Sequence, residues 1–566
     1  MGLRRGLWPG SIAAVLVLGC ASGAPGAGGP ERPAAPQLAV PAAGAKAHES
    51  TAPAQRGGTF VYGHAGIMPS CYTLQVEERT ANAALDHVYE TLVRYDYLKA
   101  RDYRAELEVK PRLAERWEQP NSTTYIFHLR KDVKWHDGQR FTADDVLATA
   151  QTILKENFRS ASTWRPFTKM EKVDDYTLRL TTEGAAPMAL VGLGQPSDAE
   201  ILPKKYLEAG TMEQNCIGTG SFKVVSWDKT KIEQVANPDF YMKDEAGGKL
   251  PYLDKVRLIM GMNRSAQEAA LAAGEIDLYN FNSFEDLEAF QKKIPDLKVE
   301  PFWSHHTYSL LLNAKKKPFD DPNVRKALNL LMDRTRMMDL VTAGYGKIGL
   351  PVVPAIKEGW GISQEELFKT PGWRKDKAED ITEAKRLLAA AGLADGFTFD
   401  HLYIKTWSGA QLSEALPGLL KPYGLDIKLR GVDGGTATKE GRDGNFDTFL
   451  RLVANFDPLM RTDEFFYTKS EMAIVSGITD KGQDALIDQL RSELSAAKQK
   501  ELVRKIQEII VANHWTVPMG DPPIFAATRG WVNNYRPNFS VLPDLSGTSE
   551  WLWLDQGLLP AKRKGG

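Results

Sequence analysis

Apolar and polar side chains alternate over residues 125–129, which places every second side chain on one face of an extended chain. Asp137-Gly138 follows, a pair that tolerates the backbone of a tight turn. From residue 142 onward apolar positions recur every three or four residues, and Thr142 and Asp145 are spaced to cap the start of a helix. The stretch therefore predicts a half-buried strand, a turn and an amphipathic helix.

The same patterns predict elements along the rest of the chain. Strands are expected at 58–63 and 308–313, a hairpin at 170–180, and helices at 81–92, after Asp321-Pro322, at 380–392 and across 480–513. Residues 515–554 are expected to return strands to the first part of the fold. The strand, turn and helix at 125–154 are typical of a lobe of the α/β class, and their spacing alone supports no more.

Length and composition restrict the function only weakly. At 566 residues the chain is long enough for two or three lobes, and its 43% hydrophobic and 25% charged residues are ordinary for a soluble globular protein. Its net charge of -1 does not indicate binding to nucleic acid or to an anionic membrane surface. Partners therefore have to be inferred from sites.

The first residues predict export. Arg4 and Arg5 precede an apolar run at 12–18 that is too short to span a bilayer stably, so a signal at 1–19 is favoured over a membrane anchor. The cysteine at its end resembles that of a bacterial lipobox, which implies acylation of Cys20; cleavage without a lipid is the alternative. Residues 20–57 are rich in Ala, Pro and Gly and predict a flexible tether.

Two further cysteines, Cys71 and Cys216, complete the three in the chain. In an exported protein such a pair favours a disulfide, and a free buried pair is the alternative. The residues are far apart in sequence, so a bond would join an early segment to a much later one.

Motifs of enzymes are missing from the sequence. It contains no G-x-S-x-G, H-E-x-x-H or C-x-x-C. The glycine run at 218–222, GTGSF, lacks the Gly-Lys-Ser/Thr half of a nucleotide-binding loop, so a close backbone crossing is the better interpretation. We therefore predict neither catalysis nor a cofactor, and a secreted hydrolase is the rival from another class.

His305-His306 is the one histidine doublet in the sequence. Imidazoles can bind a metal ion or a polar ligand. Adjacent residues of a strand point to opposite faces, so both would rarely bind one ion. We keep His306 as a candidate ligand contact and predict no metal site.

Several long strings resemble one family. Residues 127–146 read FHLRKDVKWHDGQRFTADDV and residues 313–329 read NAKKKPFDDPNVRKALN. Both resemble the extracellular solute-binding proteins of ABC importers, specifically the oligopeptide, dipeptide and nickel-binding family, and the resemblance runs with gaps over 58–518. It implies a large type II periplasmic-binding-protein fold with two lobes.

The resemblance also implies a domain plan. The first lobe is expected to carry an extra inserted subdomain, and ligand is expected between the lobes, which close about the crossing strands. The expected parts are lobe I at 58–91, 202–302 and 517–560, the inserted subdomain at 92–201, and lobe II at 303–516.

Four pocket positions follow from dipeptide-binding members. Lys405 and Trp407 stand where those members have Arg-x-Tyr, so Lys405 would meet a ligand carboxylate and Trp407 would offer a flat aromatic wall. Asn455 stands where those members have an aspartate that pairs with the amino terminus of a peptide. An amide supplies no full charge, and Asp457 is expected to compensate.

The expected function is capture of a small solute and its delivery to a permease in the cytoplasmic membrane. A short peptide or peptide-like amine is the expected ligand; an oligosaccharide, an opine or a nickel chelate are the alternatives. The protein is expected to be monomeric, to bind no nucleic acid, and to be periplasmic or at the cell surface on a lipid anchor.

Overall fold

The structure is a computed structural model. The residues that it describes are 50, 52–68, 70–75, 84–95, 109–158, 160–196, 198–281, 283–302, 306–342, 344–348, 360, 362–405, 409–454, 462, 465–520, 523–537, 545 and 548–563. The expected signal at 1–19, Cys20 and the tether as far as residue 49 lie outside them. None of the helices in the described ranges combines the length and the apolar character that a membrane span requires.

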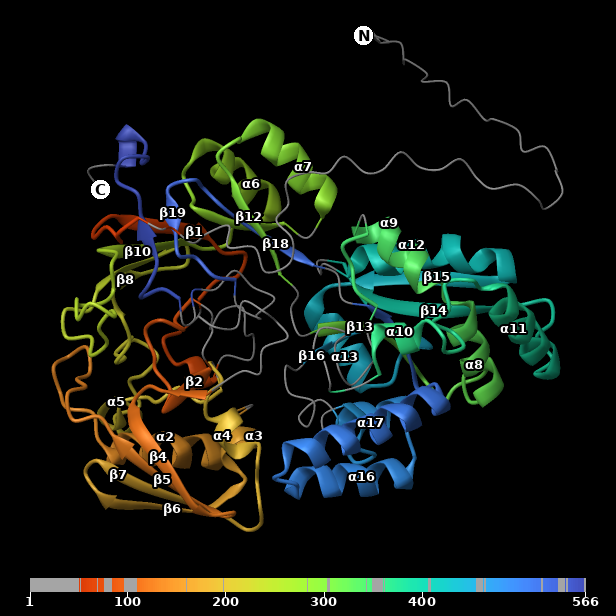
Figure 1. Cartoon of the computed structure of the whole chain (residues 1–566), viewed down its shortest axis with the longest axis horizontal. Coiled ribbons are helices and arrows are strands. Elements are labelled where there is room, and N and C mark those ends of the chain that lie inside the picture. Colours follow the sequence, from red (N-terminus) through yellow and green to blue (C-terminus); the bar gives the residue numbers. More distant parts are fainter. Residues whose placement is uncertain are drawn as a thin grey trace, which may run out of the picture. The chain divides into compact units, whose positions relative to one another are not determined.

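A seven-stranded sheet organises the first part of the chain (Figure 1). Its central strand, β1, pairs in parallel with β10 and β11, whereas β18 runs antiparallel between β11 and β12. Helices α6 (Arg264–Ala273) and α7 (Phe284–Lys293) pack beside β11. In sheet order the strands are β12 (Lys298–Phe302), β18 (Ile524–Thr528), β11 (Leu278–Phe281), β1 (Thr59–Gly63), β10 (Lys255–Ile259), β9 (Lys231–Ala236) and β8 (Phe222–Trp227).

A four-stranded sheet contains the strand, turn and helix predicted from residues 125–154. In β5 the side chains of Tyr125, Phe127 and Leu129 are buried and their neighbours are half-buried, as the alternation predicts. Gly138 has a φ of 89°, and Thr142 and Asp145 form a capping box at the start of α2. The sheet order is β4 (Ala114–Asn121), β5 (Thr124–Leu129), β7 (Thr177–Thr182) and β6 (Phe167–Asp174), with α2 (Ala143–Glu156) beside it.

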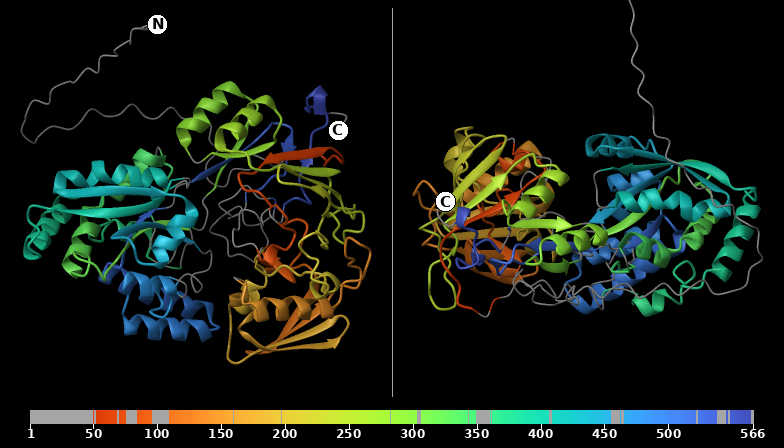
Figure 2. Two further views of the ribbon diagram at one scale, coloured as in Figure 1. Left: turned by 180° about the vertical axis from the view of Figure 1, so that it is seen from behind. Right: turned by 90° about the horizontal axis from the view of Figure 1, so that it is seen from above.

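A five-stranded sheet organises the second part of the chain. Helices cover both of its faces (Figures 1 and 2): α8, α9, α11 and α12 pack on the face of Leu310, and α13, α15, α16 and α17 on the face of Leu311 and Val453. The strands, in order, are β15 (Leu425–Val432), β14 (Phe397–Ile404), β16 (Thr448–Ala454), β13 (His306–Leu312) and β17 (Thr516–Gly520). The helices are α8 (Pro322–Leu331), α9 (Arg334–Thr342), α11 (Ala378–Ala390), α12 (Ala410–Leu420), α13 (Gly434–Arg442), α15 (Glu471–Ser476), α16 (Lys481–Ser492) and α17 (Ala496–Asn513).

Short elements connect these sheets. The short strands are β2 (Val93–Tyr95), β3 (Val109–Pro111), β19 (Val532–Asn533) and β20 (Trp553–Leu554). The short helices are α3 (Ala161–Trp164), α4 (Ala189–Gly192), α5 (Lys204–Glu208) and α10 (Gln364–Leu367), with 3-10 turns at Thr73–Gln75, Lys421–Tyr423 and Ala561–Arg563.

Three predicted elements come out differently. The helix expected at 81–92 is wrong over its described part, 84–92. Residues 84–88 form turns, and the carbonyls of His87 and Val88 accept hydrogen bonds from the backbone N–H groups of Phe222 and Gly220. The helix expected from 380 begins at Ala378. The helical stretch at 480–513 is two helices, α16 and α17.

The residues at which the chain leaves one large sheet and enters the other can be compared with the expected lobe boundaries. β17 ends at Gly520 inside the five-stranded sheet, and β18 begins at Ile524 inside the seven-stranded sheet. The division at 302/303 and 516/517 stays a prediction, and the sheets favour moving the second boundary past Gly520.

The end of the chain returns to the central strand of the first sheet. Asp277 is fully buried and accepts hydrogen bonds from the backbone of Val61 at 2.7 Å and from the indole of Trp531 at 2.7 Å. Arg563 forms an ion pair with the same carboxylate and donates to the carbonyl of Thr59 at 2.7 Å. The last turn of the chain thereby ties β1 to the start of β11.

A buried charge cluster joins three segments that are distant in sequence. Arg112 donates from Nε to Glu90 at 2.7 Å and from Nη1 to Glu550 at 2.9 Å, and all three side chains are nearly inaccessible. The hydroxyl of Tyr241 donates to Glu90 at 3.1 Å. Burial alone would raise the pKa of Glu90, but the nearby charges of Arg112 and Arg94 outweigh burial and lower it.

Replacing Arg112 by Met is expected to lower the free energy of unfolding by about 3–5 kcal/mol, because two buried carboxylates lose their cation. Urea unfolding of the purified protein measures the change. Arg116→Met is the control, since Arg116 pairs with Glu118 at an exposed position and its loss should leave the midpoint nearly unchanged. Equal midpoints for the two variants would contradict a stabilising role for the cluster.

Candidate ligand-binding site

One edge of the five-stranded sheet collects the predicted ligand positions. β14 and β16 run parallel, with His401 opposite Thr448, so their carboxyl ends lie at the same edge. β13 runs antiparallel to β16 and begins there, with His306 opposite Ala454. Lys405 directly follows β14 and residue 455 directly follows β16. Register alone therefore brings Lys405, His306 and the end of β16 to one edge.

The described residues cover only part of this predicted set. Lys405 is exposed, and its backbone N–H donates to the carbonyl of Val432 at 3.0 Å. His306 is described as the first residue of β13. Trp407, Asn455 and Asp457 lie outside the described residues. The part that these side chains play in binding stays a prediction.

Glycines let bulky side chains lie close to this edge. A Cβ on Gly409 would stand 2.2 Å from the ring of Tyr308, so the chain that follows β14 passes tightly over β13. A Cβ on Gly431 would stand 2.7 Å from the ring of Tyr403 and 2.8 Å from Cγ of Lys405. The aliphatic stem of Lys405 therefore lies over Gly431, which supports the ammonium at the exposed end of the sheet.

The seven-stranded sheet presents a matching edge. β11 and β12 end at Phe281 and Phe302, and β18 begins beside them, with Phe525 opposite Phe281 and Ile524 opposite Phe302. The chain passes from one sheet to the other between Phe302 and His306, and returns between Gly520 and Ile524. The edges with the candidate residues are thus the edges that the two passages join.

Asn280 is a buried polar residue near this edge that the sequence patterns did not indicate. It lies on β11, is 9% exposed, and neither its side-chain oxygen nor its nitrogen has a hydrogen-bond partner among the described residues. Most buried polar atoms in proteins are paired, so this amide calls for an explanation. The available signal was a polar residue inside the otherwise apolar strand Leu278–Phe281.

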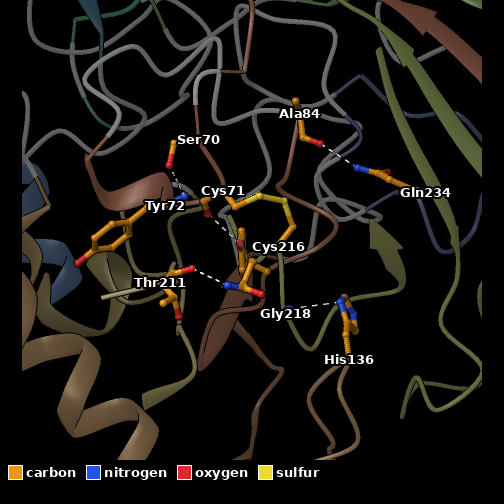
Figure 3. The surroundings of a disulfide bond; sticks show 11 residues. Ser70, Cys71, Tyr72, Ala84, His136, Thr211, Cys216, Gly218 and Gln234 are labelled. Carbon is orange, nitrogen blue, oxygen red and sulfur yellow. Dashed lines mark hydrogen bonds between the residues drawn. A yellow bond between two sulfur atoms is a disulfide. The ribbon is translucent and has the colours of Figure 1, made fainter. Parts of the chain in front are cut away.

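A disulfide holds the loop that follows β1. Figure 3 shows Cys71 bonded to Cys216, with a Cα–Cα distance of 4.9 Å across 145 residues of sequence. The backbone N–H of Cys71 donates to Glu213 at 3.1 Å, and the hydroxyl of Tyr89 donates to the carbonyl of Cys71 at 2.8 Å. The loop at the carboxyl end of the central strand is therefore fixed by a covalent bond and by backbone contacts.

His136 clamps the glycine run beside this disulfide (Figure 3). Its Nδ1 accepts from the backbone of Gly218 at 3.2 Å, and its Nε2 lies 3.1 Å from the carbonyl of Gly220, which implies the neutral Nε2–H form. Burial lowers the pKa of His136 to about 4. A Cβ on Gly218 would stand 1.9 Å from the carbonyl of Val88, so the run is a close backbone crossing, as the sequence predicted.

Neither a metal-binding group nor a pocket elsewhere in the described residues involves the predicted ligand residues. Among the described residues no group of three or more His, Cys, Asp or Glu could hold a metal ion. An open pocket of about 400 Å³ lies beside α9 and α10, lined by Met338, Asp339, Glu365 and Phe368 among others. None of the predicted ligand residues lines it, so we do not assign the ligand to this pocket.

The chain is similar to known proteins over most of its length. The sequence profile "Bacterial extracellular solute-binding proteins, family 5 Middle" matches residues 108–472. Di/tripeptide-binding protein 1 of Pseudomonas aeruginosa (strain UCBPP-PA14) is 26% identical over 516 residues, which are 83% of this chain and 90% of that protein.

Solved structures agree with the fold. The periplasmic binding protein DppA from Helicobacter pylori, in complex with the peptide STSA, superposes with a TM-score of 0.73 at 22% identity and covers 88% of this chain and 98% of its own. AgaA from A. tumefaciens R10, in complex with agropinic acid, has a TM-score of 0.71 at 22% identity, over 88% of this chain and 99% of its own. These matches confirm the predicted two-lobed binding-protein fold.

Proposed function

The chain belongs to the bacterial extracellular solute-binding proteins of family 5, and from this membership we propose that its ligand is a short peptide or peptide-like amine. Membership makes it the solute-binding component of an ABC importer and not an enzyme. The ligand, the residues that bind it and the membrane anchor are the proposed parts.

The observation that carries the ligand proposal is the common sheet edge. Lys405 directly follows β14, His306 begins β13 at the same edge, and β16 ends there at Ala454, the residue before Asn455 in the sequence. A free peptide has a carboxylate at one end and an ammonium at the other, so this set of groups suits it. The relative named for di- and tripeptides matches over nearly its whole length, which supports the same class.

Each proposed residue has one task in binding. Lys405 pairs with the ligand carboxylate, Trp407 packs on a flat or apolar part of the ligand, and Asn455 accepts a hydrogen bond from the ammonium. Asp457 supplies the charge that Asn455 lacks, and His306 adds a polar contact. Closure of the lobes then removes water, and no bond of the ligand is changed.

An opine-like ligand is the second candidate. AgaA, which shares the fold, is described in complex with agropinic acid. Such a ligand also carries a carboxylate for Lys405. An oligosaccharide or a nickel chelate remains a further alternative, although neither needs a paired cation and amide.

Thermal unfolding with a panel of di- to pentapeptides, opines, sugars and nickel chelates tests the proposed class. A peptide is expected to raise the midpoint in a saturable way, with a rise that grows as the logarithm of its concentration. Stabilisation by an opine alone would favour the second candidate. Cleavage of the peptides without any shift in midpoint would contradict the function altogether.

Lys405→Met is expected to weaken binding of a peptide with a free carboxylate by about tenfold or more, because a charge-assisted hydrogen bond is lost. Calorimetry with the same peptide capped as its amide should show little difference between the variant and the wild type. Lys428→Met is the matched control, since Lys428 is an exposed lysine on the neighbouring strand β15, paired with Asp426 at 2.6 Å. Equal losses for free and capped peptide would remove Lys405 from carboxylate binding.

The membrane anchor is proposed from the N-terminal residues. The family is extracellular, and acylation of Cys20 would hold the globular part outside on the tether at 20–57. Cys20→Ser is expected to move the protein from the membrane fraction to the soluble fraction of cells. Membrane retention of that variant would contradict the lipid anchor.

A further inference from the structure

We propose that the side chain of Asn280 binds the main chain of an extended peptide, by donating to one backbone carbonyl and accepting from one backbone N–H. This inference rests on the proposed function, because it takes the ligand of the site to be a peptide. It adds a contact from the seven-stranded sheet to a site whose described residues, His306 and Lys405, stand at the ends of two strands of the five-stranded sheet.

The hydrogen bonding of Asn280 differs from that of four other buried asparagines. In Asn237 the side-chain nitrogen donates to Gly220 at 2.9 Å and the oxygen accepts from Asp239 at 3.1 Å. Asn313, Asn329 and Asn533 likewise use both atoms. Asn280 uses neither among the described residues, although it is 9% exposed. An unpaired buried amide costs free energy, so a ligand group that pairs with both of its atoms would be stabilised there.

The position of Asn280 suits a ligand contact. Ala526 of β18 lies opposite Asn280 on one side and opposite Glu300 of β12 on the other. Ala526 is fully buried, and its short side chain stands between the amide and the carboxylate in this row. Two residues further along β18 and β12, Ile524 and Phe302 end the sheet where the chain passes to the other sheet.

The chemistry of this position selects among ligand groups. The N–H and C=O of one residue in an extended chain point to the same side, and a carboxamide offers the complementary acceptor and donor side by side. Glu300 of β12, which is also buried, stands in the same row beyond Ala526. The ligand group that fits is a neutral peptide backbone, and this contact would not depend on the side chains of the peptide.

Asn280→Ala tests the proposal in the full-length protein, with Asn237→Ala as the matched buried control. The probes are trialanine and its analogue N-methylated at the central residue, or the tightest peptide of the panel and its N-methyl analogue if trialanine does not bind. Calorimetry should show that Asn280→Ala weakens the plain peptide about tenfold. The N-methyl analogue should lose affinity for the wild type and much less additional affinity in the variant, since both changes remove one contact.

Stability without ligand separates a binding role from a structural one. Asn280→Ala is expected to leave the thermal midpoint unchanged or higher, whereas Asn237→Ala should lower it, because only the second removes formed hydrogen bonds. Unchanged affinity in Asn280→Ala would overturn the inference, and so would a lowered midpoint. If the wild type binds no peptide at all, the proposed function fails first, and the panel reveals that before any variant is made.

Discussion

The double passage of the chain between its two large sheets is the constraint on which the site depends. Both passages leave from strand ends, at Phe302 and Gly520, and both arrive at strand starts. Strand register then decides which other residues lie at those edges. Lys405 and Asn280 are far apart in sequence, yet each is placed beside a passage by the pairing of the strand that carries it or that precedes it. Ligand binding at such edges couples capture of the solute to motion about the passages.

The residues that made the family recognisable mainly hold the sheets together. His136, in the long signature string, contacts the backbone of Gly218 and Gly220. Asn329, in the second string, donates from its side chain to the carbonyl of Thr516 at 3.0 Å. These side chains form hydrogen bonds within the protein. They therefore identify the fold but give no information about the ligand.

Local patterns predicted local structure well. The alternation at 125–129, the turn at Gly138, the capping box of Thr142 and the cap of α8 by Asp321 all depend on neighbours in sequence. The expected helix at 81–92 failed because distant groups, above all Gly220, take the backbone hydrogen bonds that a helix would need. Asn280 was missed for a related reason: its missing partners can be seen only after Leu278–Phe281 is placed between β1 and β18. No Gly or Pro marks the break between α16 and α17, so the sequence pattern did not predict it.

The interior place of β18 in the seven-stranded sheet sets the order in which the chain can fold. β11 and β12 cannot pair with their common neighbour until residues 524–528 have been synthesised, and the carboxylate of Asp277 gains Arg563 only at the very end. The five-stranded sheet, by contrast, has all its strands once Gly520 is made. The five-stranded sheet therefore has its last strand a few residues before the seven-stranded sheet does. A chain cut short just before Ile524 would keep every strand of the five-stranded sheet but would leave β11 and β12 without the strand that lies between them.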